Sequence, residues 1–223
     1  MFILLTLVTF LLLISISYFQ SRRQETVTAS ELVLRQASPP VPQMVREDGF
    51  EIPKGYCFHP GHTWVLDEGR QNARIGLDSF AANLIGKIDR IEVAAPNRWV
   101  RQGRRIWRVT RNGLSVDMVS PIEGEVIAVN YNALQDPSIV TKDPYRDGWI
   151  LVVKSPDIAT NLNNLIQGAW VRTWMQNTLD RLGSLASQLG VPVAQDGGLP
   201  IAGLLARVES GLQRRMIREF FLT

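Results

Sequence analysis

The chain has 223 residues, of which 45% are hydrophobic and 20% are charged, and its formal net charge is +3. This composition excludes a chain that is disordered throughout. The length leaves room for one modest domain with appendages. The single cysteine, Cys57, excludes an internal disulfide and a zinc site built only from cysteines.

The N-terminus is apolar, because the first twenty residues contain no charged side chain. As a helix, residues 2–19 would span about 27 Å, close to the hydrocarbon core of a bilayer. We therefore expect a transmembrane anchor over residues 1–20 that contacts the lipid bilayer through residues 2–19. A cleaved signal peptide is the alternative, because residues 27–29 (Val-Thr-Ala) resemble a cleavage site. Arg22 and Arg23 follow the run, so the positive-inside rule predicts a single-pass membrane protein whose soluble part is cytoplasmic.

Two segments with different sequence patterns follow the predicted anchor. The prolines of residues 21–48 (Pro39, Pro40 and Pro42) favour an extended linker. In residues 49–157, short β-branched and aromatic runs alternate with turn residues. This pattern is typical of a compact β domain.

Residues 158–223 show helical periodicity instead, with apolar residues at three- and four-residue spacing. We expect an amphipathic helical extension here. It either forms a helical hairpin that packs on the β domain, or docks a partner or a membrane surface. The second interpretation rests on a basic and aromatic group made of Arg214, Arg215, Arg218, Phe220 and Phe221.

The β domain carries an ordered series of motifs. They are His62-Thr63-Trp64, residues 75–81 (IGLDSFA), residues 84–88 (LIGKI), residues 120–126 (SPIEGEV), Asp143-Pro144-Tyr145 and Gly148-Trp149-Ile150. In this order and spacing, residues 58–157 resemble the H protein of the glycine cleavage system, a relative of lipoyl and biotinyl carrier domains. The resemblance implies a mainly β fold, a flattened β-barrel of two small sheets (a barrel-sandwich hybrid). We expect this domain to stand between an N-terminal transmembrane helix and the C-terminal helical extension.

The resemblance also implies chemistry on one lysine. In the family this lysine stands at a hairpin tip, seven residues before the serine of a Ser-Pro motif, and carries lipoate through an amide bond. The corresponding position before Ser120 is Gly113, and the chain's lysines are Lys54, Lys87, Lys142 and Lys154. Arginine cannot replace the lysine, because a guanidinium stays protonated and is a poor nucleophile. Asn112-Gly113 instead favours a two-residue hairpin turn, so we expect no lipoate and no other cofactor.

Two interpretations of the missing lysine are open: a decayed carrier, or a domain retained for its binding surface. We favour the second, because the surrounding pattern is intact and new segments have been added. The hypothesis is a non-catalytic, membrane-tethered adaptor or structural subunit that binds a protein partner. The alternatives are a working H-protein-type carrier in glycine decarboxylation, which the resemblance alone implies, and a structural subunit of a membrane electron-transfer complex. No nucleophile elbow, phosphate loop or dinucleotide fingerprint occurs, so we expect no enzymatic activity.

A stretch between Glu92 and Asp117 contains no acid and is rich in arginine and tryptophan. It is either a solvated basic surface or a docking patch for a protein or for anionic lipid. Nucleic-acid binding is disfavoured, because no other nucleic-acid motif occurs. Strand alternation puts Arg108 and Arg111 on opposite faces, so these arginines do not all share one face. The expected partner contacts are Arg104, Arg105, Trp107, Arg108 and Arg111.

Three potential metal ligands, Cys57, His59 and His62, stand close together in the sequence. The chain has no further cysteine or histidine, so an acid or water would have to complete the coordination sphere. His62 also matches a position of the family, which favours a structural role for it. We therefore expect no metal site.

Overall fold

The computed structural model describes residues 6, 9–17, 39, 41–47, 50–188 and 202–222. The chain divides into two compact units, Met1–Ala37 and Ser38–Thr223. The described residues of the first unit are helical. Among all described residues, no helix is long and apolar enough to cross a bilayer. Parts of the predicted anchor over residues 2–19 and much of the predicted linker over residues 21–48 lie outside the described residues, and both stay predictions.

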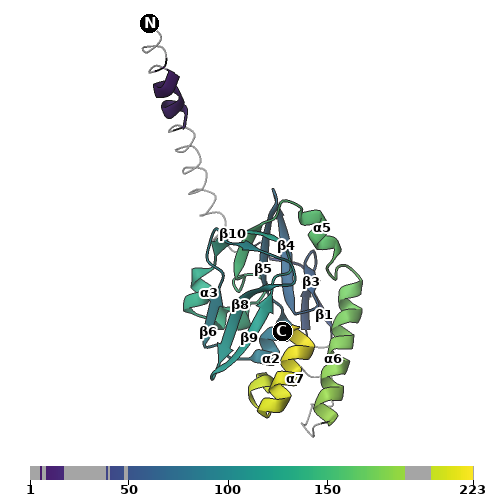
Figure 1. The fold of residues 1–223 in the computed structure, drawn as a ribbon. Helices are drawn as coiled ribbons and strands as arrows, with labels where there is room; N and C mark the ends of the chain where they lie inside the picture. Colours follow the sequence, from purple (N-terminus) through teal and green to yellow (C-terminus); the bar gives the residue numbers. More distant parts are fainter. Residues whose placement is uncertain are drawn as a thin grey trace. The chain divides into compact units, whose positions relative to one another are not determined.

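The second unit is built mainly from antiparallel strands (Figure 1). A hairpin of β1 (Met44–Glu47) and β2 (Phe50–Pro53) comes first. A larger sheet has the order β3-β4-β5-β11-β10-β7, and a smaller sheet has the order β6-β8-β9. The larger sheet contains β3 (Cys57–His59), β4 (Thr63–Gly69), β5 (Asn72–Leu77), β7 (Trp99–Val100), β10 (Gly124–Val129) and β11 (Leu151–Lys154). The smaller sheet contains β6 (Arg90–Val93), β8 (Arg105–Arg111) and β9 (Leu114–Val119). The predicted mainly β fold is confirmed.

Large aromatic side chains form the core of the β domain. Trp64 on β4, Phe80 and Trp149 are each at most 2% exposed. Burying one such ring contributes roughly 2–3 kcal/mol to stability. The edge of this core is polar: the Arg74 guanidinium lies 4.7 Å from the Trp149 ring centroid and pairs with Glu68 at 2.8 Å. The buried Arg74 guanidinium is therefore stabilised by the face of the Trp149 ring and by the Glu68 carboxylate.

Helices connect the strands and follow the last one. The first, α2 (Ser79–Ile85), is capped by Asp78, whose side-chain Oδ1 accepts a hydrogen bond from the Ala81 amide at 2.8 Å. A carboxylate at this position satisfies an amide that would otherwise lack a partner. The other helices of the described chain are α3 (Tyr131–Gln135), α4 (Ser138–Lys142), α5 (Ile158–Asn163), α6 (Trp170–Gln188), the 3-10 helix η1 (Leu204–Ala206) and α7 (Ser210–Phe221).

The last helix, α7, packs on the β domain beside β9 (Figure 1). Phe220 and Phe221 are fully buried, and the Phe220 ring lies 5.3 Å from the Phe80 ring of α2. The interpretation that these two phenylalanines contact a membrane is therefore wrong, because burial removes both rings from the surface. The neighbouring arginines Arg214 and Arg215 remain exposed.

Candidate functional site: the β8–β9 hairpin and its arginine surface

The β8–β9 hairpin ends in a two-residue turn. The last cross-strand pair joins Arg111 and Leu114, which leaves Asn112 and Gly113 between the strands. Both turn residues have positive φ, 48° for Asn112 and 79° for Gly113. This geometry suits a type I′ turn, in which asparagine and glycine are favoured because they tolerate left-handed backbone conformations. The predicted tight turn is present, with Gly113 exposed at its tip.

The tip is fastened to the loop between α2 and β6. The Asn112 amide donates to Asp89 Oδ2 at 2.7 Å, and the Asp89 amide donates to the Thr110 carbonyl at 2.9 Å. Charge-assisted bonds of this kind are stronger than neutral ones. The tip is therefore held against the body of the domain instead of projecting freely.

Arg111 fastens the same hairpin to the C-terminal extension. Its guanidinium donates to the Ile85 carbonyl and lies against Gly86 and Gly203, where an added Cβ would collide with it. The Gly203 amide donates to the Asn83 carbonyl at 2.8 Å, which holds this segment on α2. Arg111 thus makes contacts within the domain, and the expectation that it contacts a partner stays a prediction.

Trp107, another expected partner contact, is only 2% exposed and offers a partner little surface. Arg105 and Trp107 are two residues apart, so a regular strand would place them on the same face. A register shift between them explains why Arg105 is exposed and Trp107 is buried. The bulge turns Arg105 outward onto the face of Arg108, which strict alternation would not give. The structure therefore exposes Arg105 and places Trp107 in the core.

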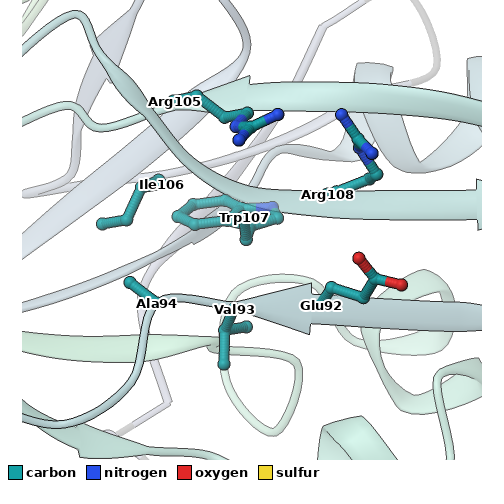
Figure 2. Close-up of a pocket in the computed structure, with 7 residues that line it drawn as sticks. All are labelled: Glu92, Val93, Ala94, Arg105, Ile106, Trp107 and Arg108. Atoms are coloured by element: carbon teal, nitrogen blue, oxygen red, sulfur yellow. The ribbon is translucent and has the colours of Figure 1, made fainter.

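Arg105 and Arg108 share one carboxylate, that of Asp117 on β9. Arg108 binds Asp117 through Nε at 2.7 Å and Nη2 at 3.0 Å, and Arg105 Nη1 lies 3.3 Å from it. The hydrogen bond from Arg108 holds the pKa of Asp117 below its usual value, and Asp117 in turn raises the pKa of Arg108. Figure 2 shows Arg105, Arg108 and Glu92 around a shallow pocket over Trp107. The positive charges of Arg105 and Arg108 are balanced by Glu92 and Asp117, which makes the pocket a poor site for a free anion.

The exposed basic surface lies next to this pair. Arg98, Arg101 and Arg104 are exposed, and no ion pair involves them within the described part of the chain. Trp99, on β7, is 54% exposed. We call Arg98, Trp99, Arg101 and Arg104 the basic patch. It combines positive charge with an accessible indole, as protein-docking surfaces often do. Of the residues expected from the sequence, Arg104 belongs to this patch.

The three potential metal ligands have separate partners. Cys57 Sγ lies 3.6 Å from Gln167 Oε1, and His59 Nδ1 accepts from the Gly61 amide at 3.0 Å. No group of metal-binding side chains is present among the described residues. Burial raises the pKa of the Cys57 thiol and lowers the pKa of His59. The raised pKa disfavours the thiolate of Cys57, which is the form of cysteine that binds a metal or attacks as a nucleophile.

His62 is instead a buried structural residue. Its Nδ1 lies 2.7 Å from Asp78 Oδ2, so one carboxylate caps α2 and holds the imidazole. The ring lies between Phe80, with centroids 4.3 Å apart, and Trp174 of α6, with centroids 4.9 Å apart. The structural role expected for His62 agrees with this packing.

Comparisons with known proteins identify the family. The model of the glycine cleavage H-protein family matches residues 56–178, more than half of the chain. The chain belongs to the glycine cleavage H-protein family. The glycine cleavage system H protein of Prochlorococcus marinus is 32% identical over 117 residues, which are 52% of this chain and 89% of the relative. The mitochondrial H protein of Pisum sativum is 35% identical over 105 residues, which are 46% of this chain and 63% of the relative.

A solved structure is also similar. The crystal structure of an H protein from Mycobacterium marinum gives a TM-score of 0.44 and 24% sequence identity, over 47% of this chain and 87% of the other. The match to the H-protein family ends at residue 178, inside α6. The α7 helix, which contacts β9, and Gly203, which lies against the Arg111 guanidinium, both lie beyond this match.

The tip of this H-protein-family domain does not fit lipoate. An amide linkage to lipoate needs a primary amine, and the turn between Arg111 and Leu114 offers only Asn112 and Gly113. The structure does bring one lysine close: Lys87 is exposed and follows Gly86, which lies against the Arg111 guanidinium. Sequence spacing gave no sign of this proximity, because three strands, β6, β7 and β8, lie between Lys87 and the tip.

Proposed function

We propose that this member of the H-protein family is a membrane-tethered adaptor that docks a protein partner and carries no lipoate at its hairpin tip. The observation that carries the proposal is the Asn112-Gly113 turn. A lipoyl carrier works through an acylated amine at this tip, and neither turn residue has one. The Arg111 contacts support the proposal further, because they tie the hairpin to the body of the domain.

The partner surface in this proposal is the basic patch. Its arginines carry exposed positive charge, and Trp99 is an indole that a partner can cover. Arginine and tryptophan are enriched among residues that dominate binding energy, and complementary charge accelerates association. The expected partner is therefore a protein with an acidic face. Partners of the glycine cleavage type are the first to examine, because the relatives are H proteins of that system.

Charge reversal tests the docking surface. We expect the triple variant Arg98→Glu, Arg101→Glu, Arg104→Glu to lower partner recovery from the host membranes on the order of tenfold or more, because like charges then face each other. The matched control reverses Arg214 and Arg215, which are exposed on α7 and do not belong to the patch. Equal recovery with the triple variant and the control would contradict the proposed surface.

A second candidate function is a carrier in glycine cleavage, and the family membership favours it. The specific structural observation is Lys87, an exposed lysine that follows Gly86, which lies against the Arg111 guanidinium. In this alternative Lys87 is acylated in place of the lysine at the tip. Peptide mass spectrometry separates the two functions: an acyl adduct on Lys87 that disappears in Lys87→Arg supports the carrier, and unmodified Lys87 supports the adaptor.

A further inference from the structure

We propose that Asn112 is a site of spontaneous deamidation, and that its conversion to an acid releases the hairpin tip from the body of the domain. Asn112 is followed by Gly113, and the chain contains no other Asn-Gly pair. Both residues are exposed at the end of the β8–β9 hairpin. The inference does not depend on whether the domain is an adaptor or a carrier, because it concerns only the turn.

The reaction is an attack of the backbone on a side chain. The backbone nitrogen of Gly113 bonds to Cγ of Asn112, the Cγ–Nδ2 bond breaks, and the proton of the Gly113 amide leaves with Nδ2 as ammonia. The product is a cyclic imide. Water then opens the ring at either of its two carbonyls, which gives aspartate or isoaspartate at position 112. Water is the co-reactant, and nothing is oxidised or reduced.

The structure leaves the two reacting groups free to meet. Within the described part of the chain, no hydrogen bond engages the Gly113 amide or the Asn112 side chain. A Cβ added at Gly113 would have no atom within 4 Å, so the space around this residue is open. Glycine also permits close approach of its backbone, because it has no Cβ of its own. Exposed loop tips open locally at little cost in free energy, which lets the turn leave its left-handed conformation.

Asn97 provides a comparison within the same chain. It is also exposed, and its backbone is left-handed as well, with a φ of 61° against 48° for Asn112. The residue that follows it is Arg98 instead of glycine. The Cβ of Arg98 hinders the approach of its backbone nitrogen to the asparagine side chain. Exposure and backbone conformation are therefore matched, and the following residue differs.

Conversion of Asn112 changes the contact that fastens the tip. The Asn112 amide donates to Asp89 Oδ2 at 2.7 Å, so an acid at position 112 brings a second carboxylate to this contact. Like charges at short range repel each other. Isoaspartate also routes the main chain through the side-chain carbon, and this longer path no longer fits a two-residue turn. Both products therefore weaken the hold of Asp89 on the tip.

Peptide mass spectrometry of the folded full chain, aged in mildly alkaline buffer, tests the modification. We expect Asn112 to convert roughly tenfold or more faster than Asn97. One ammonia is released per conversion, and treatment with protein isoaspartate methyltransferase labels the isoaspartate fraction. Gly113→Ala should slow the conversion, because the added Cβ hinders the attacking nitrogen and has room to be accommodated. The chain unfolded in urea gives the rate that the sequence alone sets.

Three results would overturn the proposed modification. They are equal rates at Asn112 and Asn97, equal rates in wild type and Gly113→Ala, and an Asn112 that stays intact in the folded chain while the unfolded chain converts.

The release of the tip is tested with a variant that carries the charge of the product. Asn112→Asp should increase amide exchange at Asp89 several-fold, because the Asp89 amide donates to the Thr110 carbonyl beside the tip. Asn97→Asp adds the same charge at the other exposed asparagine and should leave this exchange unchanged. Equal exchange at Asp89 in wild type and Asn112→Asp would overturn the release.

Discussion

Replacing Phe220 with alanine tests whether the C-terminal helix is part of the folded domain. Phe220 is fully buried and its ring contacts Phe80 at 5.3 Å between centroids. Removing a buried phenylalanine ring costs about 3–5 kcal/mol, because transfer energy is lost and a cavity remains. With an m-value of roughly 2–6 kcal/mol/M, the guanidinium chloride midpoint should fall by about 1 M. The melting temperature should fall by about 10 °C.

Leu222→Ala is the matched control for this variant. Leu222 is an apolar residue just beyond the same helix, but it is 53% exposed. Its truncation should therefore change the free energy of unfolding by no more than about 0.5 kcal/mol. If Phe220→Ala and Leu222→Ala have the same effect, α7 is not packed on the β domain. The account of Arg111 as a link between the hairpin and the C-terminal segment would then lose its basis.

Two further predictions concern the hairpin. Gly203→Val should lower the melting temperature and increase amide exchange at the Asn112-Gly113 turn, because its side chain would collide with the Arg111 guanidinium. Unchanged exchange would contradict the link. Arg108 lowers the pKa of Asp117 in the folded state. The Asp117 carboxylate therefore stabilises the fold at pH values above its unfolded pKa of about 3.9, and this stabilisation is lost as pH falls through the folded pKa. The unfolding free energy of Asp117→Asn should therefore lose this acidic dependence, whereas exposed Asp180→Asn should keep it.

The sequence predicted what local patterns determine. The mainly β fold follows from short alternating runs and turn residues, and the Asn112-Gly113 turn follows from two residues that accept positive φ. Both depend on neighbours in the chain, which a sequence displays directly. The position of Gly113 at the tip could be counted from Ser120 for the same reason.

Features that depend on distant contacts were not predictable in this way. A bulge places Arg105 and Arg108 on one carboxylate, and periodicity alone gives no sign of a bulge. Arg111 points inward because Gly203, far along the chain, leaves room for its guanidinium.

The aromatic residues show the same limit. Trp99 and Trp107 both stand among arginines in the sequence, yet Trp99 is 54% exposed and Trp107 is 2% exposed. An amphipathic pattern likewise indicates that α7 has an apolar face, but not whether a sheet or a membrane covers it. The burial of Phe220 and Phe221 shows that the β domain covers this apolar face.

Intact-mass and peptide mass spectrometry of the full chain, purified from its own host membranes, tests the central claim most directly. The account predicts a mass without any acyl group, an unmodified Lys87, and the N-terminal residues 1–20 still present. A lipoyl or other acyl group on any lysine would contradict the adaptor function and establish the carrier.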